Sequence, residues 1–146
     1  MLKALLFVAA LLAAAPAFAQ TAADVDKKID DVLGGPHEIY ATAIKTIETA
    51  VANRDLQTIA GYVSFGDPIK VDGQDVTLND LDDLTAKFDT LFPAKVIDAV
   101  TNQKYEALMV SANGIMFGDG ELWISGVCDD DACKNPFINI TAINTK

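Results

Sequence analysis

The sequence holds few residues that could perform acid–base or nucleophilic chemistry. Its one histidine, His37, directly follows Pro36 at the start of an expected helix, where the helix dipole disfavours a protonated imidazole. A Ser-His-Asp or Cys-His site would have to use His37, and no nucleophile motif surrounds it. We therefore expect an exposed histidine at a helix start, and we assign no catalytic residue.

The two cysteines, Cys128 and Cys133, enclose an acidic tetrapeptide. In an oxidising compartment this spacing favours one disulfide that closes a tight loop, since it is not the C-x-x-C spacing of redox sites. Asp129, Asp130 and Asp131 inside the loop carry the oxygen ligands that Ca²⁺ prefers. The calcium-loop pattern with its distal Glu is missing. We therefore favour a solvated hairpin tip, and we expect no metal and no cofactor.

Glu121 and Trp123 form the one neighbourhood that suggests sugar chemistry, because an aromatic ring can stack on a sugar. Glycoside hydrolysis needs two carboxylates about 5 to 10 Å apart. On a strand, positions 121 and 123 share a face. The simpler interpretation is that Trp123 caps the core or lines a cleft, and that Glu121 stabilises a hairpin.

Charge excludes several classes of function. The chain has 11 basic and 21 acidic side chains and a net charge of −10, which repels a phosphate backbone and excludes nucleic-acid binding. Arg54 is the single arginine and no glycine-rich phosphate loop is present, which argues against phosphoryl transfer. One expected helix has a negative face that is either solvated or a docking face for a basic partner. Its members are Asp80, Asp82, Asp83 and Asp89.

Residues 1–19 have the pattern of a secretory signal peptide. A positive charge at Lys3 precedes the apolar run 4–15, and Ala17-Phe18-Ala19 gives a small-x-small site before Gln20. The run is shorter than the roughly 20 residues of a membrane-spanning helix. We expect cleavage between Ala19 and Gln20, export to the periplasm or the cell exterior, and no membrane span afterwards.

The remaining chain divides into an N-terminal acidic segment, 20–35, and one domain, 36–146. Apolar residues at helical spacing predict a long helix over 36–53 and a short one over 56–63. Asp72-Gly73 predicts a hairpin, and Asn79 is a good N-cap for a helix over 81–91. A further helical turn or two is expected at 96–100, and strands at 107–112, 115–117, 122–127 and 137–143.

Helices that precede antiparallel strands indicate an α+β fold, with N-terminal helices packed on a curved antiparallel sheet. The segments FPAKVI at 92–97 and GIMFGDGELWI at 114–124 resemble small exported bacterial proteins of the nuclear-transport-factor-like, or cystatin-like cone, group. The resemblance implies a long helix across a curved sheet, with a cleft between them. Enzymes of that group pair an Asp base with a Tyr and an acid donor. Tyr40, Tyr62 and Tyr105 are present, but none lies in a motif that carries such a role.

These observations favour a non-enzymatic periplasmic or secreted binding protein, such as an acidic inhibitor or immunity-type protein for a basic envelope enzyme. The alternative is a small-molecule carrier, or a cofactor-free isomerase-like enzyme, that takes a small apolar ligand in the cone cleft. Tyr40, Tyr62, Glu121 and Trp123 are the candidate cleft residues.

Overall fold

A computed structural model describes residues 19–128, 131 and 133–146 of the chain. The elements follow one another with short connections, helices mostly first and strands mostly last. In chain order they are α1 (Ala22–Leu33), α2 (His37–Asn53), α3 (Leu56–Ala60), β1 (Pro68–Val71), β2 (Gln74–Thr77), α4 (Leu81–Leu91), α5 (Ala94–Thr101), the 3₁₀ turn η1 (Tyr105–Ala107), β3 (Met109–Ser111), β4 (Gly114–Phe117), β5 (Leu122–Val127) and β6 (Phe137–Ile143). The predicted α+β class is confirmed.

Helix α1 forms from the segment predicted at 20–35 and packs against η1 and β3. Thr21 and Asp24 make a capping box at its start, and Gly34 ends it with φ +71°. The hydroxyl of Tyr105 donates a hydrogen bond of 2.7 Å to Asp26. Val25 and Ile29 are fully buried, so this helix contributes to the same core as the rest of the chain.

The strands form one sheet in the order β2-β1-β6-β5-β4-β3. The expectation of a purely antiparallel sheet is wrong, because β1 pairs with β6 in parallel through Lys70–Ala142 and Val71–Ile143. Every other pairing is antiparallel. A parallel neighbour arises here because β1 and β6 are joined through intervening helices rather than by a tight turn.

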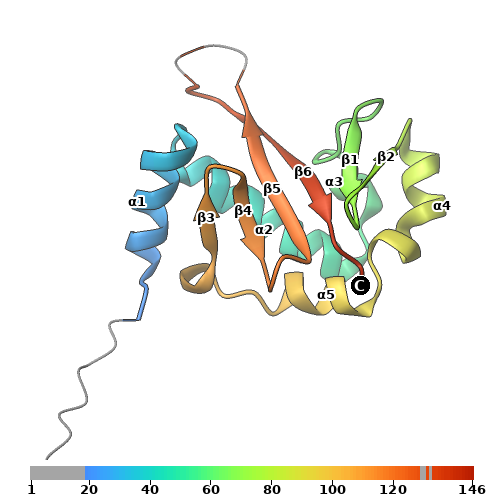
Figure 1. Cartoon of the computed structure of the whole chain (residues 1–146), viewed down its shortest axis with the longest axis horizontal. Helices are drawn as coiled ribbons and strands as arrows, with labels where there is room; N and C mark the ends of the chain where they lie inside the picture. The colour runs from blue at the N-terminus through green and yellow to red at the C-terminus, as the bar shows by residue number, and fades with distance from the viewer. Residues whose placement is uncertain (1–18, 129–130, 132) are drawn as a thin grey trace, which may run out of the picture.

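Figure 1 shows α2 running behind the sheet, with α1 near β3 and α4 at the opposite end of the molecule. The layer between α2 and the sheet is filled with large apolar side chains. Strand β3 begins at Met109 rather than at 107, because Tyr105–Ala107 is a 3₁₀ turn. Fully buried members of this core are Ile44, Ile47, Phe88, Phe92, Phe117, Leu122, Ile124 and Ile140.

Candidate functional site

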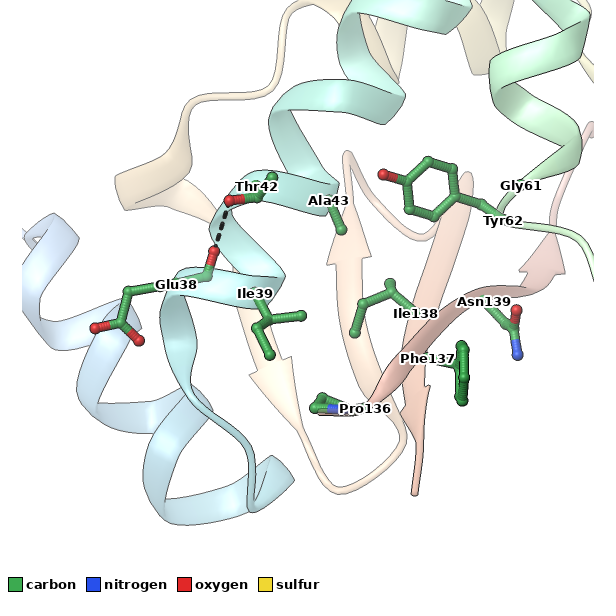
Figure 2. A pocket seen from close by; sticks show the side chains of 10 residues that line it. All are labelled: Glu38, Ile39, Thr42, Ala43, Gly61, Tyr62, Pro136, Phe137, Ile138 and Asn139. Carbon is green, nitrogen blue, oxygen red and sulfur yellow. Dashed lines mark hydrogen bonds between the residues drawn. The ribbon is translucent and has the colours of Figure 1, made fainter. Parts of the chain in front are cut away.

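An open groove of about 590 Å³ lies where the first half of α2 faces the start of β6. Figure 2 shows that three segments far apart in the sequence line it. The lining residues are Glu38, Ile39, Thr42 and Ala43 of α2, Gly61 and Tyr62 after α3, and residues 136–139.

The inner wall of the groove is apolar. In Figure 2 the side chains of Ile39, Ala43 and Ile138 converge on one space, which the ring of Tyr62 borders on another side. Phe137 is 61% exposed at the rim, an unusual exposure for a large apolar side chain beside an apolar hollow. A ligand with an apolar group would therefore remove both its own surface and the groove's surface from water.

The polar groups of the groove are placed on the α2 rim and at Asn139. The hydroxyl of Thr42 donates to the backbone carbonyl of Glu38 at 2.8 Å, and the Glu38 carboxylate is directed away from the apolar wall (Figure 2). That carboxylate is the one charged group in the lining, where Lys and Arg are absent. The groove thus offers apolar contact together with one negative charge.

Tyr40 lies beneath one end of the groove and supports it rather than lining it. Its side chain is 1% exposed. Burial raises the pKa of Tyr40, and a hydrogen bond with the Gly126 backbone offsets part of that increase. An added Cβ at Gly35 would lie 3.0 Å from Pro136 and 3.2 Å from the Tyr40 ring. Tyr40 and Pro136, where the chain enters β6, therefore pack around the same two glycines, Gly35 and Gly126.

The predicted disulfide between Cys128 and Cys133 is confirmed, with 5.0 Å between the two Cα atoms. Cys128 directly follows β5 and Cys133 lies shortly before β6, so the bond joins the two chain segments at the groove end of this strand pair. The prediction about Ca²⁺ at Asp129 to Asp131 falls mostly on residues 129 and 130, which lie outside the described residues.

Glu121 and Trp123 lie away from the groove. Glu121 is 7% exposed and accepts hydrogen bonds from the Asp119 N–H at 2.7 Å and from Lys95. Burial alone would raise the pKa of Glu121, but these two hydrogen bonds leave it lowered overall. Glu121 thus holds the turn between β4 and β5. Trp123, half-buried, lines a separate shallow hollow of about 280 Å³ with Lys70, Asn113, Thr141 and Ala142.

Three of the four aspartates of the predicted acidic face make hydrogen bonds or an ion pair within the chain, and the fourth is exposed. Asp80, rather than Asn79, is the N-cap of α4, because its side chain accepts from the Asp83 N–H at 2.9 Å. Asp83 accepts from the Asn79 N–H and side-chain amide. Asp89 pairs with Arg54 at 2.6 Å, which lowers the pKa of its carboxyl. Asp82 is exposed in the first turn of α4.

His37 begins α2 as expected, but it is half-buried and hydrogen-bonded to a carboxylate of α1 rather than fully exposed. The Nδ1 atom of His37 lies 2.9 Å from Asp30, which also accepts from the His37 backbone N–H at 2.9 Å. The hydrogen bond to Asp30 raises the pKa of His37. The side chain is 31% exposed, so the residue is half-buried where α1 meets α2.

Within residues 19–128, 131 and 133–146, no cluster of three or more His, Cys, Asp or Glu side chains is arranged to hold a metal ion. In the same part of the chain, no helix has the length and apolar character needed to cross a membrane.

The groove and fold define an α+β protein with a shallow, mainly apolar recess between a helix and the start of a strand. No family model, curated protein or solved structure that was compared with this chain matches it.

Sequence reasoning identified Tyr62 as a cleft residue but did not identify the other groove residues. Ile39 and Ala43 belong to the apolar stripe of a helix, so their pattern does not differ from that of an ordinary core position. Ile138 alternates with Asn139 like any half-buried strand residue. The one available signal was Phe137 beside Pro136, a large apolar residue directly after a loop.

Proposed function

We propose that this chain is an exported, non-enzymatic binding protein and that the groove between α2 and β6 is its binding site. The observation that carries the proposal is an apolar groove whose inner wall is half-buried Ile39 with buried Ala43 and Ile138, beside the exposed ring of Phe137. An exposed apolar recess of this kind on a folded domain is typical of a site that another molecule covers.

Binding is favoured over catalysis because the ionisable groups of the groove lie apart. Glu38 lies on the α2 rim and Tyr62 borders another side, as Figure 2 shows. General acid–base catalysis needs the acid and the base within hydrogen-bond reach of the same substrate. The other candidates, Glu121 and Tyr40, are engaged in structural contacts outside the open groove.

The partner in this proposal is a basic protein of the cell envelope or exterior. The chain's net charge of −10 attracts a basic surface, and Glu38 places a negative charge on the groove itself. Cleavage after Ala19 is the proposed route to that compartment. The disulfide is consistent with an oxidising environment. A long helix across a sheet is the arrangement that the proposed resemblance to the cystatin-like cone group implies.

A small-molecule carrier is the second candidate, and the volume of the groove favours it. Ligand pockets generally measure about 300 to 1,000 Å³, and the groove's value of about 590 Å³ falls within that range. Such a ligand would bind in the groove and not between α2 and the sheet, where buried side chains such as Ile47 of α2 and Ile124 and Ile140 of the sheet fill the interior. An isomerase-like reaction in this groove would have to use Glu38 or Tyr62.

A matched pair of variants on α2 tests the proposal. Thr42 and Thr49 are both exposed and both donate to the carbonyl four residues earlier, but Thr42 alone lines the groove. Thr42→Trp should fill the groove without disturbing the core, and Thr49→Trp should leave it open. Immobilised wild type and both variants would be exposed to envelope extract from the source cells, at low and at physiological salt.

The expected result is a basic protein that wild type and Thr49→Trp retain, that Thr42→Trp does not retain, and that salt elutes. A neutral apolar dye such as Nile red, titrated into the same three proteins, tests the carrier. If Thr42→Trp retains the same proteins as wild type and binds the dye equally well, the groove is not the binding site.

A further inference from the structure

The edge of β6 that borders the groove is unpaired at Ile138. Strand β1 covers that edge only at Ala142 and Ile143, through Lys70 and Val71. The N–H of Ile140 donates to the carbonyl of Tyr62 at 2.8 Å. Nearer the start of β6, no backbone segment among the described residues continues this edge.

The strand geometry sets which backbone groups point toward the open edge. Successive residues of a strand direct their N–H and C=O groups to opposite sides. Because Ile140 bonds to Tyr62 on the side away from β5, Ile138 directs its N–H and C=O to that same side. Phe137 and Asn139 direct theirs toward β5, where they lie opposite Val127 and Ser125.

Ile138 therefore presents one donor and one acceptor at the edge of an apolar groove. Its side chain forms part of the groove wall with Ile39 and Ala43, on the α2 side of the sheet. An extended chain lying beside β6 would pair with the Ile138 backbone and would direct alternate side chains toward that wall. Helix α2 would then cover the added strand from one side.

We propose that the groove binds an extended segment of its partner protein as a strand added to β6, beside Ile138. The segment carries an apolar side chain that enters the space between Ile39, Ala43 and Ile138, and a Lys or Arg close enough to meet Glu38. The charge complementarity favours a basic segment, because the chain carries a net charge of −10 and the charged group at the groove rim is the carboxylate of Glu38, which lies 3.6 Å from Nε2 of His37. This inference rests on the proposed function and names the partner's chemistry and the way it binds.

Amide hydrogen exchange of the free protein is the first test. The N–H of Ile138 should exchange faster than the N–H groups of Asn139 and Ile140 in the same strand, because those two have partners in β5 and at Tyr62. Protection of Ile138 equal to that of Ile140 in dilute protein would overturn the proposal. Protection that appears only on concentration, together with dimer formation, would assign the edge to a second copy and would also overturn it.

The second test uses the synthetic probe acetyl-Lys-Val-Leu-Val-Lys-amide with the full chain, followed by NMR and calorimetry. Binding should slow exchange at Ile138, and Thr42→Trp should abolish it while Thr49→Trp does not. N-methylation of the one probe residue that donates to the Ile138 carbonyl should weaken binding about tenfold, which corresponds to one lost hydrogen bond. A probe with Glu in place of both Lys should bind several-fold more weakly at low salt.

Failure of this inference differs from failure of the proposed function. Binding that Thr42→Trp abolishes but that no single N-methylation weakens would overturn strand addition and leave the groove as the binding site. If the probe does not bind, but an envelope protein is retained by wild type and Thr49→Trp and not by Thr42→Trp, strand addition of this sequence class is likewise overturned. A matched charge control is Glu38→Gln against Glu106→Gln, since both glutamates are exposed and only Glu38 lines the groove.

Discussion

The carbonyl oxygen of Tyr62 accepts a hydrogen bond from the backbone N–H of Ile140, at 2.8 Å, and this contact ends the groove. The segment after α3 thereby occupies the edge of β6 that β1 does not reach. Because only one such bond forms among the described residues, they leave the start of β6 open beside Ile39 and Ala43 of α2. The groove is thus a consequence of how short β1 is and where the chain turns after α3.

Phe137→Ala should weaken binding without destabilising the fold. The ring is 61% exposed, so its removal takes little apolar surface out of the core, and the free energy of unfolding should change by less than about 0.5 kcal/mol. Loss of an aromatic contact at a binding site costs roughly 1 to 3 kcal/mol in affinity. Calorimetry of the lysine probe and urea unfolding measure the two quantities.

Val127→Ala is the matched control for that change. Val127 is 51% exposed and lies directly opposite Phe137 in the β5–β6 pair, but it does not line the groove. Equal losses of affinity in both variants would mean that general apolar surface at this end of the sheet, rather than the groove, binds the probe.

Replacement of both cysteines by serine should lower stability and loosen the groove. A disulfide that closes so short a loop contributes about 2 kcal/mol by the chain-entropy estimate. The bond also joins β5 to the segment that leads into Pro136 and β6, so its loss should weaken probe binding as well. Urea unfolding of wild type with and without reductant should reproduce the effect of the double variant. A variant with unchanged unfolding midpoint would show that the loop closure stabilises nothing.

Much of the fold could be predicted from local patterns, and the site could not. The stripe over 36–53 and the alternation at 138, 140 and 142 follow directly from burial on one face, so α2 and β6 were predicted almost to the residue. The parallel β1–β6 pairing depends on contacts between residues 70 and 142, which no local pattern encodes. The open edge at Ile138 is a property of that pairing, and it was therefore missed.

Among the charged residues, too, contacts between sequence neighbours could be predicted, whereas contacts that depend on the folded chain could not. Asp80 and Asp83 cap α4, which the sequence near Asn79 indicated to within one residue. The effect of Asp30 on His37 was not predicted, because it requires the turn at Gly34 and Gly35 to bring the end of α1 against the start of α2. A helix dipole could be inferred from sequence, whereas the carboxylate that raises the pKa of His37 became visible only in the folded chain.

The Asp30–His37 pair should make stability depend on pH in two separate ranges. The hydrogen bond to Asp30 raises the pKa of His37 above its ordinary 6.5. The protonated imidazole therefore stabilises the folded chain fully below pH 6.5, and this stabilisation is lost as pH rises through the raised pKa. The same bond lowers the pKa of Asp30 below 3.8, so its effect is lost as pH falls through that lowered value.

His37→Gln tests this dependence. The difference in melting temperature between wild type and His37→Gln should be largest between about pH 4.5 and 6, and it should shrink toward pH 8. Asp26 and Glu38 also face His37 and add to the rise of its pKa. A melting-temperature difference that stays constant from pH 5 to pH 8 would contradict the assignment. The Glu38→Gln variant should reduce the dependence without abolishing it, because Asp30 is the main partner.

Gly126→Ala should destabilise the chain by roughly 1 to 3 kcal/mol, the usual effect of an added methyl group in a packed site. The new Cβ would lie 2.3 Å from the Tyr40 hydroxyl and 2.9 Å from Pro136, so either side chain must move. Tyr40→Phe removes the hydroxyl, and in the double variant it should recover part of the loss, so that the two changes are not additive. Gly61→Ala is the comparison with a smaller expected loss, since its Cβ would need only a few tenths of an ångström of movement from the Thr58 carbonyl at 3.2 Å, and its backbone is already helical. Urea unfolding of the four variants measures the coupling; strict additivity of Gly126→Ala and Tyr40→Phe would show that Tyr40 does not hold this end of the groove.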